Sequence, residues 1–169
     1  YYEEYMDLTY CLFEEQGYYI NSAGQKFYSL SPEYVPFKEK GKCGMKVYRD
    51  FNYDDNNNDG LVVAIPAIYK EIKQPDEYAN RLIAKNAEGK YGMIDGLNNV
   101  VLPFEYTNVD YSWEELAFEK PVFKTAKGKK KGLFDPFTGN TIPAEYDGYA
   151  QARDTYGAQQ GILVRSGGK

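Results

Sequence analysis

A short acidic segment, Asp55-Asn56-Asn57-Asn58-Asp59-Gly60, has oxygen-bearing side chains at the spacing of a metal-binding loop. Asp55, Asn57 and Asp59 place side-chain oxygens at positions one, three and five of a calcium loop, and Gly60 supplies the sharp turn at position six. Ca²⁺ is a hard cation that takes about six to eight oxygen ligands. The segment therefore predicts a Ca²⁺ site at Asp55, Asn57 and Asp59, with the backbone carbonyl of Leu61 as a further ligand.

The same segment departs from the full calcium-loop pattern at its last position. The twelfth residue is Pro66, where the loop normally has a bidentate Glu, although Asp50 and Asp54 could in principle substitute for it. The flanking residues are typical of strands rather than helices, so the segment is not an EF-hand. The alternative is a polar hairpin insertion, because Asn and Asp tolerate turn geometry.

Catalytic arrangements have little support in the rest of the sequence. The chain contains no His, which removes the Ser-His-Asp and Cys-His arrangements from consideration. Its two cysteines, Cys11 and Cys43, are too few for the usual four-ligand zinc site; a single disulfide and two free thiols both stay open. Adjacent carboxylates point to opposite faces of a strand and cannot meet one substrate; they occur at Glu3-Glu4, Glu14-Glu15 and Glu114-Glu115. We expect a non-enzymatic protein with no catalytic residue, and with Ca²⁺ as its only candidate cofactor.

The elements that would position these residues follow an internal repeat. The stretches 82–106 and 122–146 match with an offset of 40, which carries Gly92, Asp95 and Tyr106 onto Gly132, Asp135 and Tyr146. Each stretch predicts a strand, a Gly-Lys turn with positive φ, and a second strand that contains the shared Gly. A tight loop at the Asp and a third strand that ends at a Pro follow.

Further copies of the repeat are altered. One has its two halves at 37–47 and 62–69, separated by an insertion at 48–61, and an earlier copy has its halves at 12–21 and 32–34. The stretch 162–169 matches the opening strand alone. We expect a single repeat domain over 1–169, with approximate copies at 11–35, 36–72, 81–109, 121–149 and 161–169. Longer polar linkers are expected at 71–81 and 110–120, the second with one or two helical turns within 112–119.

The repeated pattern is Gly, two apolar residues, Asp, a Gly-containing turn, β-branched residues, Pro, two residues and Tyr. It resembles the WG-repeat family of bacterial proteins, except that Tyr91, Lys131 and Cys43 stand where that family has its signature Trp. The Gly is kept in three copies, whereas the Asp is Asn21 in the first copy and Val47 in the second. The resemblance implies a bacterial β-repeat protein and supplies an architecture more than an activity.

The composition also predicts an all-β fold. Aromatic residues make up 17% of the chain, with 18 Tyr and 9 Phe, and these residue types pack well on pleated strands. We expect tandem β-hairpin or meander repeats in an open twisted array. A small, closed, propeller-like arrangement is the alternative, because propeller blades also run near 40 residues.

Charge and hydropathy narrow the class of partner. The net charge of −5 gives no electrostatic footprint for nucleic acid, and the basic run Lys127–Lys131 is interpreted as a solvated hairpin loop. No apolar run reaches the about 20 residues that a membrane-spanning helix needs. We expect an interaction module that binds protein, with carbohydrate or surface glycan bound through exposed tyrosines as the alternative. The compartment stays open, with a secreted, periplasmic or surface location slightly favoured over the cytoplasm.

The pairs Glu33-Tyr34, Glu105-Tyr106 and Glu145-Tyr146 recur at the repeat period. Catalytic residues are usually singular, so the recurrence favours a structural role. We expect each Tyr ring to pack between neighbouring copies, and each Glu to stay in solvent or to bond a turn.

Overall fold

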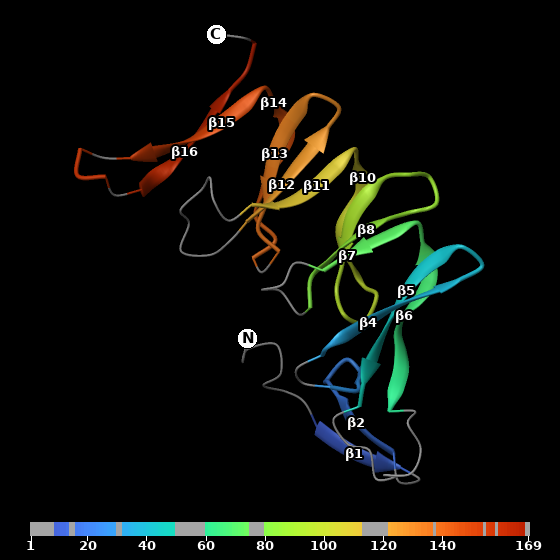
Figure 1. Ribbon diagram of the computed structural model, residues 1–169. Coiled ribbons are helices and arrows are strands. Elements are labelled where there is room, and N and C mark those ends of the chain that lie inside the picture. Colours follow the sequence, from blue (N-terminus) through green and yellow to red (C-terminus); the bar gives the residue numbers. More distant parts are fainter. Residues whose placement is uncertain are drawn as a thin grey trace. The chain divides into compact units, whose positions relative to one another are not determined.

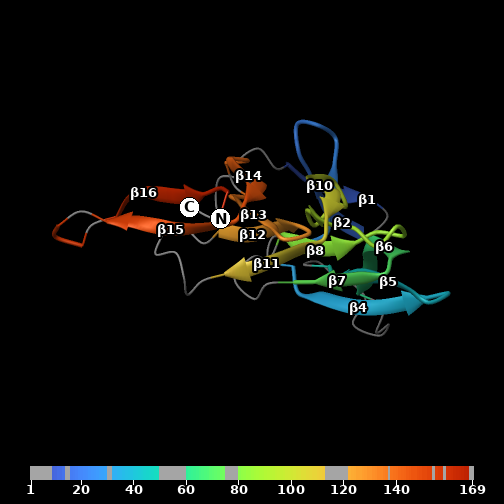
Figure 2. The ribbon, with the colours of Figure 1, turned by 90° about the horizontal axis from the view of Figure 1, so that it is seen from above.

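The computed structural model describes residues 9–13, 16–29, 32–49, 60–74, 80–112, 122–136, 138–153, 155–157 and 159–167. Every regular element in these ranges is a β-strand, and the strands form several small antiparallel sheets, none of them closed into a barrel (Figures 1 and 2). The predicted all-β class and the open meander arrangement are confirmed. No helix in these ranges has the length and hydropathy to cross a membrane.

The strands follow the chain from sheet to sheet (Figure 1). The first sheet contains β1 (Thr9–Phe13), β2 (Gln16–Ile20) and β3 (Lys26–Phe27), and the second contains β4 (Tyr34–Glu39), β5 (Lys42–Tyr48) and β6 (Leu61–Tyr69). The third has the order β10 (Val100–Tyr106), β9 (Tyr91–Ile94), β8 (Leu82–Lys85) and β7 (Glu71–Lys73). The fourth contains β11 (Asn108–Ser112), β12 (Val122–Lys127), β13 (Lys130–Phe134) and β14 (Thr141–Tyr146), and the last contains β15 (Gly148–Arg153) and β16 (Gln159–Arg165).

The chain divides into two compact units. Unit 1 contains Tyr1–Leu82 and Ile94–Asn99, and unit 2 contains Ile83–Met93 and Val100–Lys169. The extent of the predicted single repeat domain and the boundaries of its copies stay predictions. Each site described below lies within one unit.

The hairpin turns between the first two strands of the copies have the predicted backbone. Gly41, Gly89 and Gly128 have φ angles of 74°, 80° and 61°, in the left-handed region that glycine adopts without steric cost. In the β4–β5 hairpin, Lys40 also has a positive φ, and the pair Glu39–Lys42 closes the turn. Positive φ at both central residues is the type I′ geometry that matches the twist of the flanking strands.

The glycine shared by the copies lies where the middle strand meets the third strand at a bulge. A Cβ atom built on Gly132 would overlap the carbonyl oxygen of Ile142 and lie 2.7 Å from the amide nitrogen of Ala144. One on Gly44 would lie 2.6 Å from the carbonyl oxygen of Ile65. The register shifts at both glycines. The repeat therefore keeps Gly because any side chain here would meet the backbone of the third strand.

The conserved Asp closes the tight loop between the second and third strands. Asp95 Oδ1 accepts hydrogen bonds from the backbone amides of Leu97 and Asn99 at 2.9 Å and 2.8 Å. Asn21 does the same in the first copy, where its Oδ1 accepts from the amide of Gln25 at 2.9 Å. An Asn can replace the Asp because the loop needs an acceptor oxygen at this point rather than a charge.

The third strand of each copy does not end at its Pro. The strands β6, β10 and β14 continue past Pro66, Pro103 and Pro143 and reach the Tyr of the copy. Each of these strands is the last in its sheet, and each Pro is exposed. Pro is tolerated on an edge strand because the N–H group that it lacks is not needed by a neighbour there.

The expected linkers between copies begin with strands. Residues 71–73 form β7 and residues 108–112 form β11, and each adds a fourth strand to the copy that follows it. The hairpin β15–β16 has the same relation of a linker strand to an opening strand. Residues 113–120, where helical turns were expected, lie outside the described residues.

The core is aliphatic and aromatic, and alternate residues of the strands point into it. Its fully buried members include Ile65, Leu82, Met93, Ile94, Val109 and Phe123. One buried polar group stands out among them. Thr125 on β12 is only 2% exposed, and its hydroxyl has no hydrogen-bond partner in the part of the chain that the structure describes. A buried hydroxyl in this state costs free energy of folding.

Candidate functional sites

The predicted calcium ligands Asp55, Asn57 and Asp59 lie outside the described residues, and the Ca²⁺ site stays a prediction. The base of the insertion that carries them is described: the Arg49 amide donates to the carbonyl of Gly60 at 2.8 Å. Within the described ranges, no group of three or more His, Cys, Asp or Glu residues could hold a metal ion.

The two cysteines are free thiols. Cys11 and Cys43 are both half-buried, and neither forms a disulfide. The Cys43 thiol donates to the carbonyl of Lys70 at 3.5 Å. Of the two arrangements that the sequence left open, the structure therefore has the unpaired one.

The pair Glu105-Tyr106 divides between solvent and core, whereas Tyr34 and Tyr146 of the other two pairs are half-buried. Tyr106 is 5% exposed, whereas Glu105 lies in solvent and bonds Lys127 at 2.7 Å. Burial, and then the negative charge of Glu105, raise the pKa of the Tyr106 phenol. The hydrogen bond to Glu105 in turn raises the pKa of Lys127, whose Nζ lies 5.1 Å from the centre of the Tyr106 ring. The pair therefore has a structural role: Glu105 and Tyr106 of β10 both contact Lys127 of β12.

Tyrosines at the ends of other copies reach polar side chains in unit 1. The Tyr69 hydroxyl donates to Asn98 Oδ1 at 2.6 Å, and burial raises the pKa of Tyr69. The Tyr34 hydroxyl donates to Asn80 Oδ1 at 3.3 Å. It lies so close to Gly96 that a Cβ atom there would overlap it. Gly96 thus leaves the space in which the Tyr34 hydroxyl sits.

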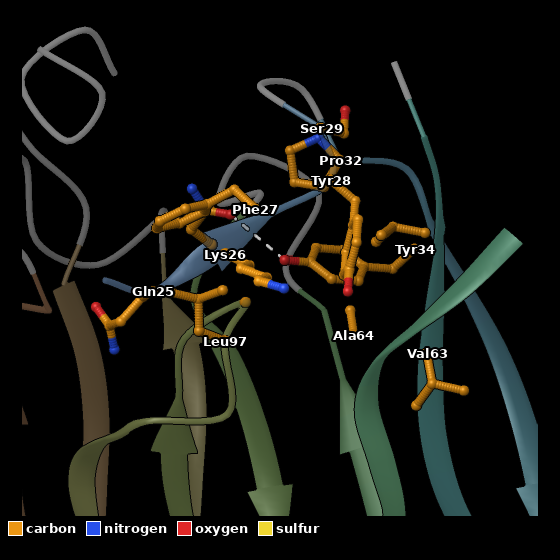
Figure 3. A pocket seen from close by; sticks show the side chains of 13 residues that line it. Gln25, Lys26, Phe27, Tyr28, Ser29, Pro32, Tyr34, Val63, Ala64 and Leu97 are labelled. Atoms are coloured by element: carbon orange, nitrogen blue, oxygen red, sulfur yellow. Dashed lines mark hydrogen bonds between the residues drawn. The ribbon is translucent and has the colours of Figure 1, made fainter. Parts of the chain in front are cut away.

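A cavity of about 250 Å³ lies in unit 1 beside Tyr34. Figure 3 shows its lining, with Phe27 and Tyr28 from β3 and the residue after it, Tyr34 from β4, and Val63 and Ala64 from β6. Aromatic and aliphatic side chains make up most of the wall, and Ser29, Asn80 and Gln25 add polar groups. Such a combination of apolar wall and few polar groups is typical of a ligand pocket.

The charges near this cavity are positive. No Asp or Glu is among the lining residues that the structure describes, although the whole chain has a net charge of −5. Lys26 lines it, with its Nζ 4.6 Å from the centre of the Tyr18 ring. The guanidinium of Arg49 lies 5.1 Å from the centre of the Tyr28 ring, one of the lining rings. The cavity therefore favours an uncharged or anionic group over a cation.

Apolar side chains are exposed on the strands around the cavity. Val63, which lines it, is 51% exposed, and Ile68 further along β6 is 50% exposed. Tyr48 at the end of β5 is also 50% exposed. Of these three, Val63 alone lines the cavity, and an exposed apolar side chain at a concave site is typical of surfaces that contact another molecule.

A second, larger cleft of about 620 Å³ lies in unit 2, between the sheet β11–β14 and the hairpin β15–β16. Cationic side chains from three strands line it: Lys124 from β12, Lys131 from β13 and Arg165 from β16. Its carboxylates are Asp110 and Asp147. Leu163 and Val164 on the hairpin wall are 60% and 43% exposed.

A pair of hydrogen bonds that recurs in the repeat closes the open end of the β15–β16 hairpin, which forms this wall. The Gly167 amide donates to Asp147 Oδ2 at 2.8 Å, and the Asp147 amide donates to the carbonyl of Arg165 at 2.7 Å. Forty residues earlier, Thr107 makes the same pair of bonds: its hydroxyl accepts from the Gly128 amide at 2.9 Å, and its amide donates to Ala126 at 2.8 Å. The β15–β16 hairpin, which both views show as an extended pair of strands, is thus positioned by the repeat itself (Figures 1 and 2).

Neither concave site was predicted from the sequence. Phe27, Tyr28 and Tyr34 belong to the first copy, and the cavity forms only where they meet Val63 of the second copy and Leu97 of the third. Lys131 belongs to the basic run interpreted as a solvated loop, and Lys127 and Lys130 of that run are in fact bonded to Glu105 and Asp147.

Comparison with protein-family models, with curated proteins and with solved structures finds no match to this chain.

Proposed function

We propose that this protein is a non-enzymatic module that binds another protein, and that the cavity in unit 1 receives one large apolar side chain of that partner. The observation that carries the proposal is the aromatic cavity of about 250 Å³ with the half-exposed Val63 at its wall. Contact between proteins is often dominated by a few bulky anchors that fill such pockets.

The size and lining of the cavity select the anchor. An apolar cavity of about 150 Å³ holds one benzene ring, so a cavity of about 250 Å³ has room for a phenyl, phenol or indole ring. A drug-sized ligand needs about 300–1,000 Å³. The buried Ser29 and the amide of Asn80 offer polar partners for the hydroxyl or N–H of a Tyr or Trp ring.

The WG-repeat resemblance supports the proposal in a general way, because a repeat array offers an extended surface for contacts. A glycan-binding protein is the second candidate function. Tyr156 at the tip of the β15–β16 turn is 94% exposed and could stack on a sugar. Tyr156 does not line either of the two concave sites described above. The protein-binding proposal is therefore the better supported of the two.

The test uses the amides of single amino acids as probes. We expect N-acetyl-tryptophanamide to shift the backbone NMR signals of residues 26–34 and 63–64 at millimolar concentration, and N-acetyl-alaninamide to leave them unchanged. Val63→Asp should lower the affinity for N-acetyl-tryptophanamide at least fivefold. Ile68→Asp is the matched control, since Ile68 lies on the same strand with almost the same exposure but does not line the cavity.

Selection from a displayed library of random peptides then tests the class of partner. Enrichment of peptides with an aromatic residue, lost with Val63→Asp and kept with Ile68→Asp, is the expected result. Equal binding to both variants would refute the anchor cavity. Binding of neutral oligosaccharides from a glycan panel, without enrichment of any peptide, would replace the proposal with its glycan alternative.

A further inference from the structure

The larger cleft in unit 2 differs in chemistry from the cavity in unit 1, and the difference lies in its charges. Of its two carboxylates, Asp147 is bonded to Lys130 at 2.6 Å and to the amide of Gly167, so both of its oxygens are occupied. Asp110 accepts a hydrogen bond from the side-chain amide of Asn108. Both carboxylates are therefore engaged within the protein, and neither is ion-paired with Lys131 or Arg165 in the described residues.

The cations of the cleft are left in excess. Lys131 and Arg165 form no ion pair within the part of the chain that the structure describes, and Lys124 lines the same space. With Asp147 paired with Lys130, the described lining residues leave Lys131 and Arg165 as cations without an ion pair, in a chain whose net charge is −5. Interspersed charges are expected on a surface, but a concave cationic patch on an acidic protein concentrates anions locally.

The guanidinium of Arg165 lies beside its neighbour across the hairpin. Arg165 pairs with Gly148, and a Cβ atom built on Gly148 would lie 3.6–4.0 Å from the atoms of the guanidinium. The guanidinium thus lies against the face of a residue without a side chain, at ordinary contact distance. An arginine positioned in this way can bind a carboxylate with two parallel hydrogen bonds.

The remaining wall is aliphatic. Leu163, Val164, Ala126 and Ala150 line the cleft, and Tyr149 is the single aromatic residue among the lining residues that the structure describes. Aliphatic side chains suit the apolar residues of a peptide. The volume of about 620 Å³ lies within the range of about 300–1,000 Å³ in which sites of this kind occur.

We infer that the cleft between the sheet β11–β14 and the hairpin β15–β16 binds an acidic peptide segment, with carboxylates at Lys131 and Arg165 and an aliphatic side chain against Leu163, which lies on the same face of β16 as Arg165. The inference rests on the proposed function only in that both concern protein partners. The two sites share no residue, so either can fail while the other stands.

The test is fluorescence anisotropy with a labelled hexapeptide of alternating Glu and Val. We expect it to bind, and the corresponding Gln-Val peptide to bind at least tenfold more weakly. Affinity for the Glu-Val peptide should fall when the salt concentration rises from 50 to 300 mM, because exposed charges are screened over about 10 Å at 0.1 M salt.

Variants locate the binding. Lys131→Gln and Arg165→Gln should each lower the affinity at least threefold, whereas Lys129→Gln, an exposed lysine of the same hairpin that does not line the cleft, should leave it unchanged. Val63→Asp, the variant of the unit 1 cavity, should also leave it unchanged. Far-ultraviolet circular dichroism of each variant checks that it is folded.

Three outcomes would overturn the inference. Equal loss with Lys129→Gln would mean general attraction to basic residues, and equal binding of the Gln-Val peptide would remove the role of charge. Tighter binding of polygalacturonate, lost with the same two variants, would make the ligand an acidic glycan instead of a peptide.

Discussion

Replacing Gly132 by Ala tests the explanation of the repeat glycine. The new Cβ would overlap the carbonyl oxygen of Ile142 and lie 2.7 Å from Ala144 N and from the carbonyl carbon of Pro143. Ordinary contact begins at 3.4 Å, so Ala144 N and the Pro143 carbonyl carbon must move by about 0.7 Å and the Ile142 oxygen by more. A movement of that size stretches a hydrogen bond of about 2.9 Å beyond the distance at which it counts as one.

The expected cost combines overpacking with hydrogen bonds lost between β13 and β14. Overpacking alone costs about 1–3 kcal/mol, and each weakened hydrogen bond adds about 1 kcal/mol. We therefore expect Gly132→Ala to lower the free energy of unfolding by about 3 kcal/mol. If the whole chain unfolds together, Tm should fall by about 6–12 °C, at about 2–4 °C per kcal/mol for a chain of this size.

The control is Gly161→Ala on β16. A Cβ atom there meets nothing within 4 Å, and the backbone is not in the left-handed region. Ala at such a site should be neutral or stabilise by about 0.4–1 kcal/mol, because it restricts the unfolded chain. Urea unfolding followed by circular dichroism measures both variants. A difference below about 0.5 kcal/mol between them, within the usual scatter of surface substitutions, would refute the close-approach argument.

Three further predictions concern single side chains. Thr125→Val removes the buried hydroxyl that has no partner in the described residues, and should raise the free energy of unfolding by about 1 kcal/mol. Thr125→Ser keeps the hydroxyl and should be less stable than the parent. A Thr125→Val variant that is destabilised in urea unfolding would contradict the reasoning. Tyr69→Phe removes the hydrogen bond to Asn98 and should cost about 0.5–1.5 kcal/mol at pH 7 in the same assay. Burial raises the pKa of Tyr69 and Tyr106 above the ordinary value of 10.0, so their contribution to stability is fully present below pH 10 and is lost as the pH rises through the folded-state pKa. Urea midpoints measured from pH 8 to 11 should therefore fall in the parent and fall less steeply in Tyr69→Phe; parallel pH profiles would show that Tyr69 does not contribute.

The periodic part of the fold could be predicted from the sequence because each repeated residue has a local cause. The turn glycines Gly41, Gly89 and Gly128 need a positive φ, and Asp95 needs loop amides within its reach. Both requirements are met by residues a few positions away, so the spacing alone carries them.

The strand that runs past each Pro was mispredicted for the opposite reason. Whether Pro143 ends a strand depends on whether β14 has a further neighbour, and that is a property of the sheet rather than of the segment. The linker strands β7 and β11 were missed because their polar sequences are compatible with loops. They become strands because they pair with β8 and β12, which already have a hydrophobic face.

The candidate sites could not be predicted because they join residues from different copies. The cavity in unit 1 brings Phe27, Val63 and Leu97 together across 70 positions, and no spacing in the sequence records that proximity. The one site that the sequence did propose, at Asp55, Asn57 and Asp59, is instead contiguous in the chain.

The exposed prolines of the outer strands have a consequence for solubility. Each open strand edge is a template on which another chain can add, and this is how many β proteins aggregate. Pro66, Pro103 and Pro143 each interrupt the row of donors along such an edge. Every full copy from the second onward thus has a residue on its edge strand that hinders the addition of another chain. Replacing all three prolines by Val would remove this protection without changing a core residue.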